Sequence, residues 1–160
     1  MKLKIKVKVL TPGCMPEINE KGDWIDLHVA KDIYLPAPIA NTLRRKDLYS
    51  IRDVEFCDEL APLGVAIKLP AGCEALVVPR SSTLKHFGII QANHVGVIDN
   101  TYSGNNDQWH MPMIALRETM IDSHSRVCQF RIQLSQKATL WQKIKWFLSS
   151  GIKLVEVDNL

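Results

Sequence analysis

Hydrophobic and polar residues alternate along most of this chain with the two-residue period that is typical of β-strands. The alternating runs are short, and glycine and proline residues separate them. Such a pattern predicts an all-β fold, either a sandwich or a distorted barrel. The first run alternates lysines with apolar residues, as an amphipathic edge strand does. The predicted strands cover residues 3–9, 63–69, 75–78, 89–98, 111–116 and 127–134.

Two segments break this alternation. Residues 36–60 contain prolines and a dense run of charges, and we interpret them as an insert into the β core, without assigning it a function. In residues 139–149, apolar side chains recur at helical spacing and a glycine follows, which predicts an amphipathic helix. For so short a helix, packing on the domain or on a neighbouring subunit is favoured over a membrane-surface role.

Residues 93–104 combine strand-forming residues with turn chemistry, and they predict a hairpin that lines a pocket. Asn93 and the backbone of this hairpin could match the edge of a pyrimidine. Asp99 could hold a sugar hydroxyl or activate a water. Burial would raise its pKa, but the sequence does not show whether the pKa is shifted. The alternative is an ordinary hairpin with a polar turn.

A second candidate site begins at Arg80, where an apolar strand runs into a short helix-like segment that Gly88 ends. Ser81, Ser82 or Thr83 can cap this helix. Its free N–H groups and the Arg80 guanidinium would attract phosphate oxygens. The alternative is a capped surface helix with a solvated arginine.

Several motifs occur here in an order that identifies a family. They are Gly22-Asp23-Trp24-Ile25-Asp26-Leu27, Pro79-Arg80-Ser81-Ser82, Gly96-Val97-Ile98-Asp99 followed by Tyr102 and Gly104, Asn106-Asp107-Gln108-Trp109, and Arg126-Val127-Cys128-Gln129. The chain resembles the trimeric dUTPases, deoxyuridine triphosphate nucleotidohydrolases, of the branch found in phages and Gram-positive bacteria. The similarity covers roughly residues 3–135.

The resemblance implies one domain over residues 1–160, built as a distorted jelly-roll (β-clip) barrel. A short helix would follow the Arg-Ser-Ser motif, and the amphipathic helix would be an addition to this barrel. The implied reaction is Mg²⁺-dependent hydrolysis of dUTP to dUMP and pyrophosphate by attack of water at the α-phosphorus. This reaction lowers dUTP and supplies dUMP for dTMP synthesis.

The resemblance also assigns roles to single residues. Asp99 would bind the deoxyribose 3′-hydroxyl and orient the attacking water as general base. Ser81 would contact the oxygen that bridges the α and β phosphates, and Arg80 and Gln129 would complete the phosphate and water network. Asp26 would hold the magnesium ion through water. Asn93 would read uracil, and Tyr102 would pack on the deoxyribose and exclude a 2′-hydroxyl. The other implied substrate-binding residues are Ser82, Lys85, Gly96, Val97 and Ile98.

The implied functional unit is a homotrimer with shared active sites. The hairpin of one subunit would meet the phosphate-binding residues of another. Family members also close over substrate with a glycine-rich tail, and no such tail follows Leu160 in this sequence. We therefore expect the natural protein to continue beyond Leu160, and the 160-residue chain without this lid to bind dUTP but turn it over slowly.

Two other functions are compatible with parts of this pattern. A dCTP deaminase shares the fold and the Arg-Ser-Ser motif, but it needs a glutamate on the strand after the hairpin. Residues 109–116 contain no acid, and the first one is Glu118. A non-catalytic, regulatory nucleotide-binding relative is the second alternative, and a turnover assay separates it from an enzyme.

Composition narrows the function further. The 160 residues carry a formal charge of only +3, which is too small to indicate a nucleic-acid partner. No apolar run is long enough to span a membrane, and the start does not resemble a signal peptide. The four cysteines and five histidines lack zinc-type spacing, and we expect His28, His86, His94 and His124 at the surface or in loops. We expect a cytoplasmic protein with reduced thiols.

Overall fold

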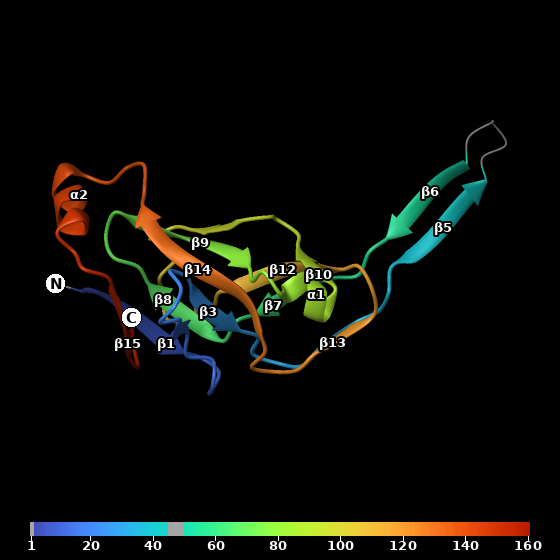
Figure 1. Cartoon of the computed structure of the whole chain (residues 1–160), viewed down its shortest axis with the longest axis horizontal. Helices are drawn as coiled ribbons and strands as arrows, with labels where there is room; N and C mark the ends of the chain where they lie inside the picture. Colours follow the sequence, from blue (N-terminus) through green and yellow to red (C-terminus); the bar gives the residue numbers. More distant parts are fainter. Residues whose placement is uncertain (1, 45–49) are drawn as a thin grey trace.

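The computed structural model describes residues 2–44 and 50–160, and for residues 40–44 and 50–54 it describes the backbone only. The predicted all-β class is confirmed, because strands form most of the regular structure and only two short helices accompany them in the described part of the chain (Figure 1). The strands are β1 (Leu3–Val9), β2 (Glu17–Ile18), β3 (Ile25–His28), β4 (Ile33–Leu35), β5 (Ile39–Arg44), β6 (Ser50–Glu55), β7 (Asp58–Pro62), β8 (Val65–Lys68), β9 (Cys73–Pro79), β10 (Ile89–Gln91), β11 (Gly96–Ile98), β12 (His110–Ala115), β13 (Thr119–Ile121), β14 (Arg126–Leu134) and β15 (Ile152–Glu156); the helices are α1 (Thr83–Phe87) and α2 (Leu140–Phe147).

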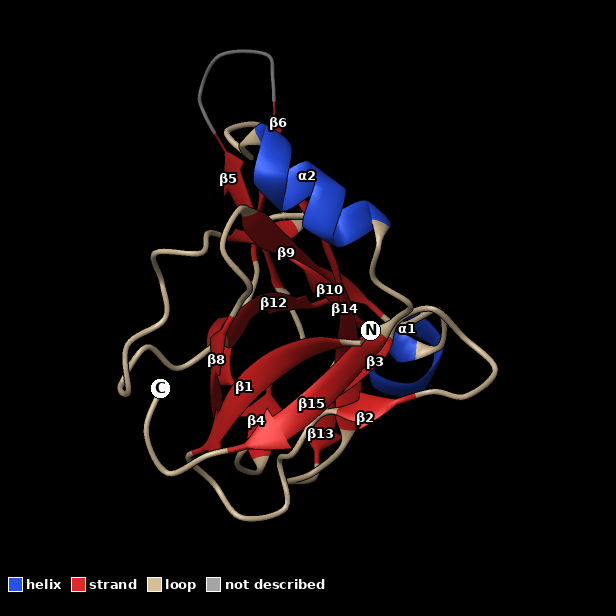
Figure 2. Ribbon diagram, turned by 90° about the vertical axis from the view of Figure 1, so that its left-hand side faces the viewer, coloured by secondary structure: helices blue, strands red, loops and turns tan. Residues whose placement is uncertain are grey.

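The strands form small sheets that wrap around one core (Figure 2). The largest has the order β11-β9-β14-β3-β2, and it positions most of the predicted site residues. Sheets of order β10-β12-β7 and β15-β1-β8 form two further walls. The core between them contains Trp109, which is fully buried and packs edge-to-face on Phe130 with ring centroids 5.1 Å apart. This aromatic pair supports the predicted strands from inside the barrel.

The first strand is not an edge strand, contrary to the expectation from its lysines. β1 pairs with β15 in parallel and with β8 in antiparallel orientation, so it is the central strand of its sheet. Its apolar residues Leu3, Ile5 and Val7 are buried, and the intervening lysines are exposed. The alternation therefore indicated one solvated face of the sheet, and a central strand of this mixed sheet has such a face as well as an edge strand.

The predicted strand over residues 89–98 is interrupted, and the predicted hairpin over residues 93–104 does not form as expected. A turn at residues 92–95 separates β10 from β11, and His94 adopts a positive φ of 60° there. β10 pairs with β12, whereas β11 pairs with β9. After β11, polar residues form turns up to Gln108, because they offer no apolar face for a second strand.

The predicted insert over residues 36–60 forms the hairpin β5–β6, which projects from the body (Figure 1). Its predicted end lies in β7, because residues 58–60 already pair with β12. The predicted amphipathic helix is α2, at the opposite end of the molecule from this hairpin. A capping box at Thr139 and Gln142 begins the helix. Among the described residues, no helix is long and apolar enough to cross a bilayer.

Candidate functional site

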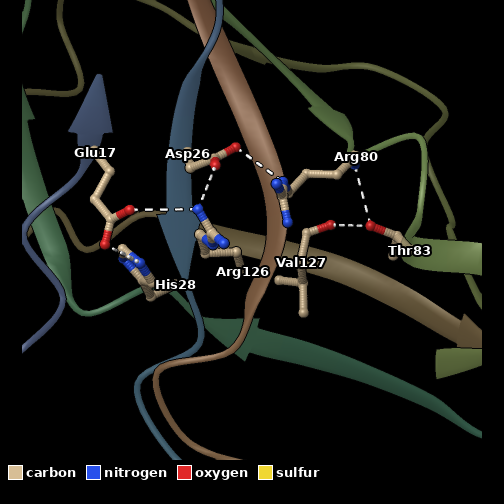
Figure 3. A network of polar contacts seen from close by, with 7 residues as sticks. All are labelled: Glu17, Asp26, His28, Arg80, Thr83, Arg126 and Val127. Carbon is tan, nitrogen blue, oxygen red and sulfur yellow. Dashed lines mark hydrogen bonds and ion pairs between the residues drawn. The ribbon is translucent and has the colours of Figure 1, made fainter. Parts of the chain in front are cut away.

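The end of β9 delivers Arg80 to a buried carboxylate on the neighbouring part of the sheet. Arg80 Nε lies 2.9 Å from Oδ1 of Asp26, which is 3% exposed (Figure 3). On β14, Gln129 pairs with Asp26 of β3 on one side and with Val78 of β9 on the other. Directly paired residues project to the same face of a sheet, so Gln129 and Asp26 share a face with Arg80 nearby. The structure thus brings together three of the predicted phosphate-site residues.

The turn that carries Arg80 is fixed by a threonine and not by a helix cap. Thr83 is buried, and its Oγ1 accepts a hydrogen bond from the Arg80 N–H at 3.1 Å and donates to the Val127 carbonyl at 2.7 Å. Ser82 is the N-cap residue, but its backbone is helical and its side chain makes no capping hydrogen bond. The expected side-chain cap is therefore wrong, because the threonine hydroxyl is used to join α1 to β14.

Further charged residues extend this ion pair into a network (Figure 3). Arg126 Nη1 is 3.4 Å from Asp26 Oδ2 and 3.5 Å from Glu17 Oε2. The second oxygen of Glu17 is 3.2 Å from Nε2 of His28. His28 is buried, so its expected surface position is wrong, and burial lowers its pKa despite the opposing effect of Glu17. The two arginines share one buried carboxylate, which restricts the orientation of Arg80.

The other residues of the Arg-Ser-Ser segment lie at the surface. Ser81 is exposed next to Arg80, and Ser82 is partly buried at the start of α1. Lys85 is exposed on α1, and its backbone carbonyl accepts a hydrogen bond from Arg117 at 3.1 Å.

Asp99 follows β11 and is exposed. Its Oδ1 accepts hydrogen bonds from the backbone N–H of Thr101 at 2.9 Å and from the Thr101 hydroxyl at 3.0 Å. These bonds, the backbone one first, hold the pKa of Asp99 below its ordinary value. Desolvation, which would raise this pKa, is weak at an exposed position, so the hydrogen bonds that favour the ionised form decide the direction of the shift.

Beside Asp99 lies a cavity of about 360 Å³. It is lined by Val97, Ile98, Asp99, Tyr102, Gln108, Trp109 and His110. The Tyr102 hydroxyl donates a hydrogen bond to the Gln108 carbonyl at 3.0 Å, which closes the loop around the cavity. This volume and its mixed apolar and polar lining suit a nucleoside.

Asn93 lies in the turn that precedes β11, and it is exposed. Its Oδ1 accepts a hydrogen bond from Nε2 of Gln91 at 2.8 Å. Gly96 begins β11 opposite Val77, with Val97 and Ile98 after it. Asn93 and the residues from Gly96 to Tyr102 are the candidate nucleoside-binding residues, and of these Val97, Ile98, Asp99 and Tyr102 line the cavity.

We call the residues around Asp99 the nucleoside half-site, and Asp26, Arg80 and Gln129 the phosphate half-site. Asp99 and Arg80 are far apart within one chain. Ile98 pairs with Ala75, so Asp99 lies beside the start of β9, whereas Arg80 follows the end of the same strand. The intervening residues, at about 3.3 Å each, separate the two groups by roughly 15–20 Å. Groups that act on the same phosphorus must approach within hydrogen-bond distance of it. A single chain does not bring its Asp99 and its Arg80 together in this way.

Comparison with known proteins gives these half-sites a family context. The dUTPase family model matches residues 25–140, a range that contains both half-sites. The chain is also 43% identical over 160 residues to the SPbeta prophage-derived deoxyuridine 5′-triphosphate nucleotidohydrolase of Bacillus subtilis, covering 99% of this chain and 90% of that protein. The chain belongs to the dUTPase family. Its similarity to a prophage protein of a Gram-positive host confirms the predicted branch.

Solved dUTPase structures share the fold. The dUTPase from Streptococcus mutans matches with a TM-score of 0.64 at 20% identity, covering 81% of this chain and 94% of that one. A variant of the dUTPase from phage phi11 of S. aureus, described with a coordinated structural Mg(II) ion, matches with a TM-score of 0.62 at 16% identity, covering 85% and 94%. These matches confirm the predicted distorted jelly-roll fold of the dUTPase type.

The described residues contain no group of three or more His, Cys, Asp or Glu side chains that could hold a metal ion. The predicted metal residue Asp26 is bound on each oxygen by an arginine. A carboxylate has about four acceptor positions, so Asp26 can still accept hydrogen bonds from water. This donor set fits a Mg²⁺ ion that substrate phosphates and waters coordinate, as is usual for this cation.

Sequence reasoning missed three residues that shape the half-sites. They are Glu17, Gln91 and, as a link between α1 and β14, Thr83. Gln91 carried a usable signal, because it occupies an inward-facing position in the alternation of β10 where an apolar residue is expected. The contacts of Glu17 with Arg126 and of Thr83 with Val127 carried no such signal, since these partners are distant in sequence.

Proposed function

We infer that this protein hydrolyses dUTP to dUMP and pyrophosphate. The observation that carries this inference is the dUTPase family match over residues 25–140, which spans the residues of both half-sites. The reaction lowers dUTP and supplies dUMP for dTMP synthesis. Free thiols at all four cysteines support a reducing compartment, and we propose that the protein acts in the cytoplasm.

The nucleoside half of the site would select the base and the sugar. We propose that uracil lies against Asn93 and the backbone of β11, whose residues are Gly96, Val97 and Ile98. Tyr102 is held by its bond to Gln108 and would pack on the deoxyribose. The Tyr102 ring would then leave no room for the 2′-hydroxyl of a ribose, so the site would disfavour ribonucleotides.

Asp99 would act on the attacking water. Its lowered pKa keeps it ionised at neutral pH, so it can accept a hydrogen bond from a water and from the 3′-hydroxyl. A low pKa makes it a modest base, and we propose that its main contribution is to orient the water in line with the leaving oxygen.

The phosphate half would stabilise the charge that develops on the pyrophosphate leaving group. Arg80, held by Asp26, would donate to phosphate oxygens, and Ser81 would contact the oxygen that bridges the α and β phosphates. Gln129 would complete the phosphate and water network, with Ser82 and Lys85 at its edge. Mg²⁺ bound to the triphosphate would neutralise further charge, and Asp26 would hold it through water.

We propose that the active protein is a homotrimer in which each site combines half-sites from different subunits. The separation of roughly 15–20 Å between Asp99 and Arg80 in one chain supports this, since most of the length of β9 lies between them. In a closed ring of three copies, the nucleoside half of one copy can face the phosphate half of the next.

The deaminase alternative receives no support from the strand that follows the candidate nucleoside-binding residues. β12 carries no acidic residue, and Glu118 lies beyond it, where its carboxylate accepts a hydrogen bond from the Tyr34 hydroxyl at 2.7 Å. The test is product analysis with dUTP and dCTP in the presence of Mg²⁺. Pyrophosphate and dUMP from dUTP are expected. Ammonia from dCTP would indicate a deaminase, and binding without turnover would indicate a regulatory relative.

A further inference from the structure

A buried glutamine fixes the orientation of Asn93. Gln91 is the last residue of β10 and is 5% exposed. Its Nε2 donates one hydrogen bond to the Val77 backbone carbonyl at 3.0 Å and one to Asn93 Oδ1 at 2.8 Å. Both hydrogens of this amide nitrogen are therefore used. Gln91 thus joins β9 to the turn that carries Asn93.

The direction of this chain of hydrogen bonds follows from its first member. A backbone carbonyl can only accept, so the Gln91 side chain must direct its nitrogen, not its oxygen, to Val77. The second hydrogen of that nitrogen then requires an acceptor, and Asn93 supplies Oδ1. The amide of Asn93 is consequently set with Nδ2 on its other side. Within the described part of the chain, this Nδ2 has no hydrogen-bond partner.

The Asn93 amino group lies beside Gly96, another candidate nucleoside-binding residue. A Cβ built on Gly96 would be 3.6 Å from Asn93 Nδ2 and 3.5 Å from Gln91 Nε2, so both groups lie over the first residue of β11. There, Asn93 presents a hydrogen-bond donor. A pyrimidine meets such a donor favourably with a carbonyl oxygen and unfavourably with an amino group.

We propose that Gln91 is a specificity-determining residue, which locks the Asn93 amide so that the site accepts the 4-carbonyl of uracil and rejects the 4-amino group of cytosine. Uracil and cytosine differ at this position as acceptor and donor. A free Asn93 could rotate its amide and offer Oδ1 to cytosine, and the Gln91 bond opposes this rotation. The proposal rests on the proposed function, because it assumes that Asn93 reads the base.

The remaining atom of Gln91 supports a role beyond packing. Its Oε1 is buried and has no hydrogen-bond partner among the residues that the structure describes. An unpaired buried acceptor destabilises a fold, so an apolar residue of similar size would serve the core better. The amide is explained if the orientation of Asn93 requires it.

The experiment compares kcat/KM for dUTP with kcat/KM for dCTP, in the wild type and in Gln91→Leu. Pyrophosphate release measures the rate with each substrate. We expect the preference for dUTP to fall on the order of tenfold, the equivalent of one hydrogen bond that no longer opposes amide rotation. The change should appear mainly in KM, because Gln91 does not contact the reacting phosphorus. Gln91→Met serves as a second variant if thermal melting shows that the leucine variant is unfolded.

A double-mutant cycle tests the mechanism, since Gln91 should act only through Asn93. In an Asn93→Ala background, Gln91→Leu should leave the dUTP to dCTP ratio unchanged. Gln133→Leu is the matched control, because it removes one side-chain hydrogen bond, to Glu74, far from Asn93. An unchanged preference in Gln91→Leu, or an equal fall in the Asn93→Ala background, would overturn the proposal. Wild-type protein that releases no pyrophosphate from dUTP would instead refute the proposed function.

Discussion

Replacing Asp26 by asparagine tests the ion pair at the centre of the phosphate half-site. Asp26 is 3% exposed and faces two guanidinium groups, at 2.9 Å from Arg80 and 3.4 Å from Arg126. Asp26→Asn removes the negative charge without a change of shape. Removing one partner of a buried pair typically costs 3–5 kcal/mol, because the other charge stays buried and unpaired.

The expected cost is at the lower end of this range. The Arg80 side chain is 25% exposed and Arg126 is nearly half exposed, so water screens both, and Glu17 still faces Arg126. We expect a loss of about 3 kcal/mol in the free energy of unfolding. For a chain of this length, that lowers the melting temperature by roughly 6–12 °C. KM for dUTP should also rise, because Arg80 loses the group that orients its Nε.

The assay is thermal unfolding by circular dichroism at pH 7.5, with Asp23→Asn as the matched control. Asp23 also faces an arginine, Arg131, but at 3.8 Å and with its side chain 79% exposed. Exposed pairs contribute little, so this control should change stability by less than about 0.5 kcal/mol. Equal melting temperatures for the two variants would refute the argument that burial makes the Asp26 pair strong.

Three further predictions concern catalysis and the extra helix. Thr101→Ala removes one of the two hydrogen bonds that lower the pKa of Asp99. The acid limb of the pH profile of kcat/KM should therefore move to higher pH. An acid limb that does not move would show that ionisation of Asp99 does not produce it. Asp99→Asn should leave dUTP binding, measured by calorimetry, within a few-fold while lowering kcat by about 10²–10⁴, and near wild-type turnover would contradict its role. Gly72→Ala should lower the melting temperature by several degrees, because φ is +79° and the added Cβ would meet the Gln142 side chain of the capping box; unchanged melting would show that α2 packs independently.

The sequence predicted the positions of strands and of the amphipathic helix, because these depend on the local pattern of apolar residues. The alternation located strands that bury one face, and the helical spacing located the amphipathic helix, which begins after Thr139 and ends at Phe147, before the predicted end at residue 149. The alternation did not predict the order of the strands in the sheets, because an alternating run does not show which other strands pair with it. Thus β1 is a central strand, and residues 89–98 divide between two sheets.

Sequence motifs predicted which residues form the candidate site. They did not predict the burial and the hydrogen bonds that set the pKa values of its residues. The motifs located Asp26, Arg80 and Gln129, which the structure brings together on one sheet face. The pKa of Asp99 depends on exposure and on hydrogen bonds from Thr101, neither of which composition reveals. The buried position of His28 was missed for the same reason, since its partner Glu17 lies on a different strand.

Mixing two inactive variants tests most directly whether the active site is shared between subunits. Asp99→Asn impairs the nucleoside half, and Arg80→Gln impairs the phosphate half while keeping an amide that can bond to Asp26. After subunit exchange at equal concentrations, random trimers should contain about one quarter of sites with two intact halves. Pyrophosphate release from dUTP should therefore recover to about one quarter of the wild-type rate. A mixture that stays as inactive as its components would show that each chain builds its own site.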